Sequence, residues 1–123
     1  MANTNQVQRT EPVTSVPALP SDYAMGASGA AAVITYASIA GQAHVCAGLI
    51  FGYDSAPQAG AYIQIQDGSG NTVFQAPITA AGIGPFKILP RKGSIATAMI
   101  ITLSAGGGAV NAYLNVDHYA EGP

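Results

Sequence analysis

From about residue 31 the sequence is a series of short runs in which apolar and polar residues alternate, each ending at Gly, Pro, Asn or Asp. A period of two places successive side chains on opposite faces of a strand, and the interrupting residues are those that turns require. The runs predict about seven strands, near residues 31–38, 43–53, 61–67, 72–78, 84–89, 96–104 and 109–119. Strands of this length and spacing, without a helical stripe, predict an all-β domain: an antiparallel β-sandwich of jelly-roll-like type.

Two connections between these runs are rich in residues that accept positive φ. The segment "QDGSGNT" joins the third and fourth runs, and this predicts a β-hairpin. The segment "SAGGGAV" joins the last two runs, and it predicts a second hairpin in the same way.

The run at 43–53 has two unlike faces. One face is expected to be core and consists of Val45, Ala47, Leu49, Phe51 and Tyr53. The other face is small and mostly apolar: His44, Cys46, Gly48, Ile50 and Gly52. Small side chains allow close backbone approach, so either another layer or chain covers this face, or the strand is buried on both faces in its own domain.

The first part of the chain differs in composition from the rest. It contains Pro12, Pro17 and Pro20, many Thr, Asn and Gln, and few large apolar residues. Proline fixes its own φ and lacks a backbone donor, which predicts an extended arm over residues 1–24 and a β domain over 25–123. Such an arm cannot bury enough surface to become ordered alone. We therefore expect a neighbouring subunit or a partner to hold it through Val13, Val16, Pro17 and Leu19.

Charge is scarce throughout the chain. Only 8% of the 123 residues are charged and the net charge is −2, whereas an ordinary soluble domain has about 25% charged residues. The small group Lys87, Arg91 and Lys92 falls short of the basic footprint that nucleic acid requires. No apolar run reaches the length of a membrane span. The lone Cys46 excludes an internal disulfide and agrees with synthesis in a reducing cytoplasm.

The sequence contains partial catalytic and metal-binding patterns, and none of them is complete. Ser69 lies at a hairpin tip and Cys46 between two apolar residues, so neither has the surroundings of a nucleophile. Two partial ligand sets occur: Asp67, Ser69 and Asn71, and then Asp117, His118 and Glu121. The first fails the calcium-loop pattern at its later positions, and the second has no complementary cluster. His44 and His118 could meet only through the fold. We therefore expect neither an enzyme nor a protein that carries a cofactor or metal.

The final run carries an unusual polar face. Its apolar side is Val110, Ala112, Leu114 and Val116, and its other side is Asn111, Tyr113, Asn115, Asp117 and Tyr119. Tyrosine gives a large contact area at low entropic cost, and loss of Lys and Glu with enrichment of Tyr is typical of interfaces. Tyr62, Gln64 and Gln66 alternate with apolar residues and form a second strand face of tyrosine and amides. These tyrosines and amides are candidate partner-binding residues; the alternative is the polar outer face of a stable monomer.

Three segments carry a resemblance to a known group: "AGQAHVCAGLIFGYDSAPQAG", "IQDGSGNTVFQAPIT" and "GSIATAMIITLSAGGGAVNAYLNV". With the residues between them, over 33–119, the chain resembles small all-β virion structural proteins of tailed bacteriophages. The resemblance implies a capsid decoration (cement) protein or head fibre on the phage head surface, made in the host bacterial cytoplasm. Its partners would be the major capsid protein and copies of itself, with a trimer favoured, and neither nucleic acid nor membrane. The alternative is a tail- or fibre-associated module that binds host surface glycans; a small hydrolase would require two converging carboxylates.

Overall fold

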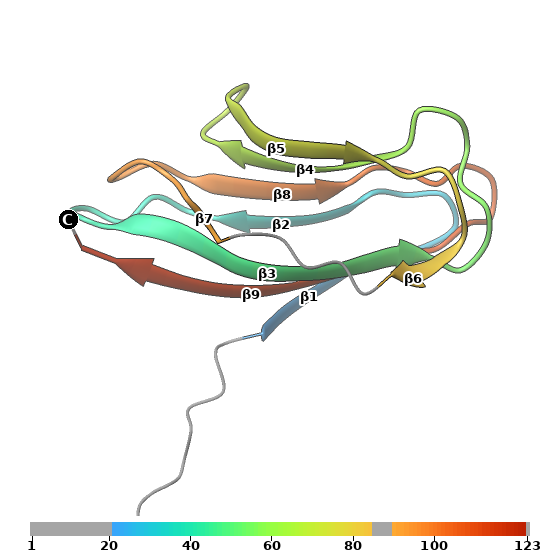
Figure 1. Ribbon diagram of the computed structural model, residues 1–123, viewed down its shortest axis with the longest axis horizontal. Helices are drawn as coiled ribbons and strands as arrows, with labels where there is room; N and C mark the ends of the chain where they lie inside the picture. The colour runs from blue at the N-terminus through green and yellow to red at the C-terminus, as the bar shows by residue number, and fades with distance from the viewer. Residues whose placement is uncertain (1–20, 85–89, 123) are drawn as a thin grey trace, which may run out of the picture.

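The computed structural model describes residues 21–84 and 90–122, which form two facing β-sheets (Figure 1). The described strands are β1 (Ser21–Gly26), β2 (Ala32–Tyr36), β3 (Ala43–Tyr53), β4 (Tyr62–Asp67), β5 (Thr72–Pro77), β6 (Gly82–Gly84), β7 (Arg91–Lys92), β8 (Met99–Leu103) and β9 (Ala112–Glu121). One sheet has the order β1-β9-β3-β6, with β7 also paired to β3, and the other has the order β2-β8-β4-β5. All of these pairings are antiparallel.

The core lies between the two sheets and follows the alternation of the sequence. In β4, buried Ile63 and Ile65 alternate with half-buried glutamines, and β8 and β9 alternate in the same way. The large buried side chains form one cluster: Leu49, Phe51, Ile63, Ile65, Met99, Ile101, Leu103, Leu114 and Val116. Burying one such side chain stabilises a fold by about 1.5–3 kcal/mol, so this cluster is a large source of stabilisation for the sandwich. The prediction of an antiparallel β-sandwich is confirmed.

The sandwich begins earlier than the predicted boundary between residues 24 and 25. Strand β1 spans Ser21–Gly26 and pairs along its whole length with β9. Gly26 ends β1 where a Cβ atom would lie 2.2 Å from the carbonyl oxygen of Ala30, so only glycine fits this turn. Residues 1–20 lie outside the described part of the chain, as does most of the run predicted at 84–89.

Strand β3 contains a β-bulge that changes which side chains face the core. Its register with β9 shifts between Cys46 and Gly48. Before the bulge, Cys46 is the residue that joins the core cluster, and after it Leu49, Phe51 and Tyr53 do. The prediction that Val45 and Ala47 share a face with Leu49 is therefore wrong, because an extra residue inverts the alternation.

One of the two predicted hairpins is present. The chain turns between β4 and β5 through Gly68 and Gly70, both at positive φ, and Asp67 N donates to Asn71 O at 2.8 Å. The segment between β8 and β9 also turns at glycines with positive φ, but these strands belong to different sheets. The second hairpin prediction is wrong, because turn residues show where the chain turns without showing which strand it joins. The described residues contain no helical segment that would qualify as a membrane span.

Candidate functional site

Strands β1, β9 and β3 lie side by side and present one continuous outer face. Tyr23 pairs with Asn115, which pairs on its other side with Ile50. In the next row, Met25 pairs with Tyr113, which pairs with Gly52. Since paired residues point to the same side of a sheet, these side chains share one surface. We call it the β1–β9–β3 face and define it by Tyr23, Met25, Ile50, Tyr113, Asn115 and Asp117.

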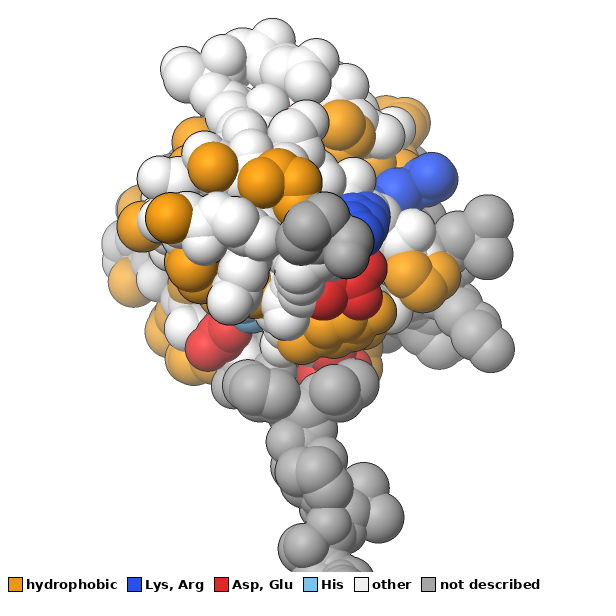
Figure 2. Space-filling model, turned by 90° about the vertical axis from the view of Figure 1, so that its left-hand side faces the viewer, with side chains coloured by type: hydrophobic (Ala, Val, Ile, Leu, Met, Phe, Trp, Pro, Cys, Tyr) orange, Lys and Arg blue, Asp and Glu red, His pale blue; other side chains and the backbone are white. Residues whose placement is uncertain are grey.

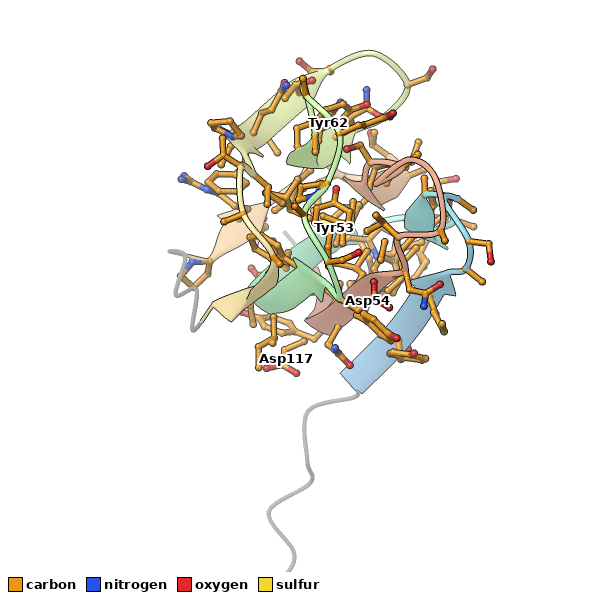
Figure 3. All side chains as sticks on the ribbon, turned by 90° about the vertical axis from the view of Figure 1, so that its right-hand side faces the viewer. Tyr53, Asp54, Tyr62 and Asp117 are labelled. Carbon is orange, nitrogen blue, oxygen red and sulfur yellow. The ribbon has the colours of Figure 1, made fainter. Side chains whose placement is uncertain are left out.

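The β1–β9–β3 face is apolar for an exposed surface. Tyr23 is 58% exposed, Ile50 53% and Met25 45%. Glycines at positions 48 and 52 flank Ile50 along β3, so no neighbouring side chain of the strand covers the isoleucine. Asp117 lies at one end of the face and points away from the sandwich (Figure 3). Contiguous exposed apolar groups of this kind mark interaction sites more often than scattered ones do.

The structure brings together four of the residues predicted from the final run. Tyr113, Asn115, Asp117 and Tyr119 alternate with the inward-facing residues Leu114, Val116 and His118 along β9 and share its outer side. Tyr119 lies further along the strand, opposite Val45, and is 38% exposed.

Asn111, the fifth predicted residue of that run, has a structural role. Its side-chain oxygen accepts a hydrogen bond from the backbone N–H of Ser28 at 2.8 Å, and its amide nitrogen donates to Asp54 Oδ2 at 2.7 Å. Asp54 Oδ1 accepts from the backbone N–H of Asn111 at 2.9 Å. These hydrogen bonds from Asn111 lower the pKa of Asp54. Asn111 therefore ties together the turns that follow β1 and β3.

Tyr62, another predicted residue, lies on the opposite side of the molecule. It begins β4, in the other sheet, and Figure 3 shows it far from Asp117. The prediction grouped it with the tyrosines of β9 because both strands alternate in the same way, and alternation carries no information about which sheet a strand joins. The predicted arm residues Val13, Val16, Pro17 and Leu19 lie outside the described residues.

A cleft lies where β3 ends beside the start of β9. It has a volume of about 480 Å³ and is lined by Tyr53, Asp54, Ala81, Gly82 and Tyr113. The Tyr53 hydroxyl is already used, since it donates to Ser104 O at 2.8 Å. A second cleft of about 270 Å³ shares Ala81 and Gly82 with the first and extends towards Pro77 and Ile78.

A polar cluster lies inside the sandwich, formed by Asp22 of β1, Tyr36 of β2, His44 of β3 and His118 of β9. We call it the histidine cluster. His44 Nδ1 and His118 Nε2 are 2.8 Å apart, and His44 Nε2 lies 2.7 Å from the carbonyl oxygen of Ala37. The Tyr36 ring stacks on His118 with centroids 3.6 Å apart and planes 6° from parallel. The Tyr36 hydroxyl donates to Asp22 Oδ2 at 2.5 Å.

The hydrogen bonds fix how the two imidazoles are protonated. A carbonyl oxygen only accepts, so His44 Nε2 carries a hydrogen, and in the neutral ring Nδ1 is then the acceptor. His118 therefore donates from Nε2 when both rings are neutral. His44 is 2% exposed and His118 is half-buried. Figure 2 views this end of the molecule, where only a small histidine area is visible beside an acidic side chain.

Burial changes the acid–base properties of this region. It lowers the pKa of His118, and the neighbouring His44 lowers it further, while Asp22 acts in the opposite direction. Burial, and then the hydrogen bond to Asp22, raise the pKa of Tyr36. Burial also raises the pKa of the Cys46 thiol to about 11. Cys46 is therefore a neutral thiol, which agrees with its interpretation as an inert core residue.

The sequence contained only part of the signal for this cluster. His118 continues the apolar series of Leu114 and Val116 along β9, so alternation alone places it on the inner side. The bulge in β3 conceals the inward direction of His44. Pairing of the two rings depends on the β3–β9 register, which alternation does not define.

The other candidate clusters do not assemble. Asp67 is buried and accepts hydrogen bonds from Ser94 N at 2.9 Å and Ser94 Oγ at 2.6 Å, so its carboxylate turns away from the hairpin tip.

The two basic residues of β7 have partners of their own. Lys92 pairs with Glu121 at 2.7 Å, and the Arg91 guanidinium lies 5.5 Å from the centre of the Phe74 ring. Within residues 21–84 and 90–122, no three His, Cys, Asp or Glu side chains are grouped so that they could hold a metal ion.

No protein-family model matches the sequence, and no curated protein matches it significantly.

Proposed function

We propose that this protein is a noncatalytic structural subunit that docks onto other protein subunits through the β1–β9–β3 face. The observation that carries the proposal is the row of exposed Tyr23, Met25 and Ile50 on one side of the sandwich. A chain with 8% charged residues has little electrostatic repulsion to keep copies apart. Covering this face removes apolar surface from water and stabilises the assembled state.

The specific form that we propose is a phage capsid decoration protein, bound across seams between major capsid subunits as a small oligomer. Besides the resemblance of residues 33–119, the strand order β1-β9-β3-β6 facing β2-β8-β4-β5 supports it. That order is the one expected of a jelly roll, an architecture used by viral capsid domains. A subunit that binds only the assembled shell stabilises that shell by mass action.

The test uses heads of a phage that encodes this chain, prepared without the protein and then supplied with purified variants. Ile50→Lys places a charge on the docking face. Val33→Lys is the matched control, because Val33 is 47% exposed on β2, which belongs to the other sheet. We expect wild type and V33K to saturate the heads and raise their disruption temperature, and I50K to do neither. Absence of wild-type binding, or equal binding by I50K, would contradict the proposal.

A second candidate function is glycan recognition at the cleft that Tyr113 and Asp54 line. Tyrosine rings stack on the apolar face of a sugar ring, and a fixed carboxylate accepts hydrogen bonds from sugar hydroxyls. Lectin domains also use the jelly-roll architecture. A glycan array probed with wild type and Tyr113→Ala tests this function. Binding that the substitution abolishes supports it, and an array without wild-type binding removes it.

A further inference from the structure

The histidine cluster lies where the edges of the two sheets meet. Strand β1 is the outermost strand of one sheet and β2 is the outermost strand of the other. Three contacts join β2 and the residue after it to the other sheet: the Tyr36 hydroxyl to Asp22 of β1, the Tyr36 ring to His118 of β9, and the Ala37 carbonyl to His44 of β3. Apart from the core, this cluster is a direct polar connection between β2 and the sheet that contains β1.

We propose that the His44–His118 pair is a proton-sensitive lock that keeps β1 attached to β2 at neutral pH and releases it in acid. The proposal concerns regulation of the fold at its edge and does not rest on the docking function. It rests on the direct contact between the two ring nitrogens at 2.8 Å.

The geometry limits how many protons the pair can accept. With both rings neutral, one N–H lies between the two facing nitrogens. One additional proton is tolerated, because the N–H···N hydrogen bond remains and the cation lies near Asp22 and against the Tyr36 ring. A second additional proton places hydrogens on both facing nitrogens and two positive charges on neighbouring rings. The hydrogen bond is then lost and the rings repel each other.

Titratable groups from three neighbouring strands, β1, β2 and β3, lie near the pair on the inner side of the sandwich. Asp22 of β1 favours the first proton, whereas Tyr36 of β2 and Cys46 of β3 remain neutral because their pKa values are raised. Asp117 of β9 points outward, and its charge acts on Tyr36 and Cys46. One carboxylate beside the rings offsets one positive charge, so the second charge is the disruptive one.

Loss of the hydrogen bond between His44 and His118 affects β1 through Tyr36. The Tyr36 ring lies against His118, so a displaced His118 ring moves the Tyr36 hydroxyl away from Asp22. Alternatively, the charged His118 ring attracts the Asp22 carboxylate away from the Tyr36 hydroxyl. Apart from its backbone pairing with β9, strand β1 places few side chains against the described part of the molecule. Tyr23 and Met25 point to solvent, and Ala24 packs against the core. Edge strands with few buried contacts open at low free-energy cost.

Amide hydrogen exchange of the full chain tests the lock, with rates corrected for the intrinsic pH dependence of exchange. Measurements at about pH 7.5 and about pH 5 lie on either side of the ordinary histidine pKa of about 6.5. We expect protection of β1 to fall on acidification by at least about tenfold more than protection of the central strand β8. Equal changes in β1 and β8 would overturn the proposal.

Two variants distinguish the effect of protonating the histidine pair from the effect of losing its contacts. His118→Gln keeps a donor for His44 Nδ1 but cannot be protonated, so the acid-induced loss of β1 protection should disappear. Tyr36→Phe keeps the stacked ring but removes the hydroxyl, so β1 should already exchange rapidly at neutral pH. An H118Q protein whose β1 still opens in acid would overturn the assignment to the histidine pair.

A titration of the wild-type protein keeps the test independent of whether H118Q folds. The imidazole NMR resonances should show a first proton shared by the pair and a second proton taken up only well below the ordinary histidine pKa of about 6.5. Two independent titrations near that ordinary value would contradict the lock.

Discussion

The two outer faces of the sandwich follow the same alternation but expose different chemistry. The β1–β9–β3 face exposes Tyr23, Met25 and Ile50 around the single amide of Asn115. A row of four uncharged residues, three of them polar, crosses the outer face of the other sheet. Each residue in the row is paired with the next: Val33, Thr102, Gln64 and Gln75. Both faces are nearly free of charge, so low charge alone does not mark a docking surface. Contiguous apolar area distinguishes the two.

The largest expected effect comes from placing one charge on each face in turn. Ile50→Lys should weaken self-association of the free protein on the order of 100-fold, because the ammonium must be desolvated at the centre of an apolar contact. Val33→Lys should change the association constant by less than about twofold. Sedimentation equilibrium of both variants measures this. Equal weakening by both would remove the distinction between the faces.

Two asparagines of the same run sharpen the comparison between docking and folding roles. Asn111→Ala removes the hydrogen bonds to Ser28 and Asp54, and should lower the free energy of unfolding by about 1–3 kcal/mol. Asn115→Ala alters only the outer face of the sheet, and should change the free energy of unfolding by no more than about 0.5 kcal/mol. Urea denaturation monitored by tyrosine fluorescence gives both values. A destabilised N115A with a normal N111A would reverse the assignment.

Acidification should affect the fold before it affects the docking face. The pKa of His118 is lowered in the folded state, so the unfolded chain binds a proton more readily. Stability is therefore full above the ordinary histidine pKa of about 6.5 and falls as the pH decreases through the lower folded-state value. Thermal unfolding followed between about pH 7.5 and about pH 5 should show this loss, and His118→Gln should reduce it. A midpoint that does not change over this range would contradict the lowered pKa.

The smallest expected effect concerns Tyr62. It lies in the sheet opposite the docking face, so Tyr62→Ala should leave self-association within about twofold of wild type. Tyr113→Ala, in the middle of the docking face, should weaken it by about tenfold. Comparing the two tyrosine variants in the same sedimentation experiment tests whether docking is limited to one sheet.

Much of this fold could be predicted from the sequence, because alternation determines which side chains in a strand are buried. Ile63, Ile65, Leu114 and Val116 are buried as their pattern requires. Strand β1 was missed because it follows prolines and contains Asp22 on its inner side. The inverted faces of β3 depend on a bulge that no pattern in the run "AHVCAGLIFGY" reveals.

The candidate sites were less predictable than the core, because they depend on which strands become neighbours. The β9 residues were identified, but their neighbours Tyr23, Met25 and Ile50 come from strands whose pairing is set by long-range register. The same register brings His44 and His118 together across 74 positions of sequence. Alternation describes each strand separately and has no information about these pairings.

Hydroxyl-radical footprinting of the wild-type protein, free and assembled, tests the central claim most directly. Met25 and Tyr23 are exposed reporters on the docking face, and Val33 is an exposed reporter on the other sheet. We predict that assembly protects Tyr23, Met25 and Ile50 from oxidation while Val33 reacts as it does in the free protein. Unchanged oxidation of Met25 and Ile50, with protection of Val33, would show that the protein docks through the opposite face.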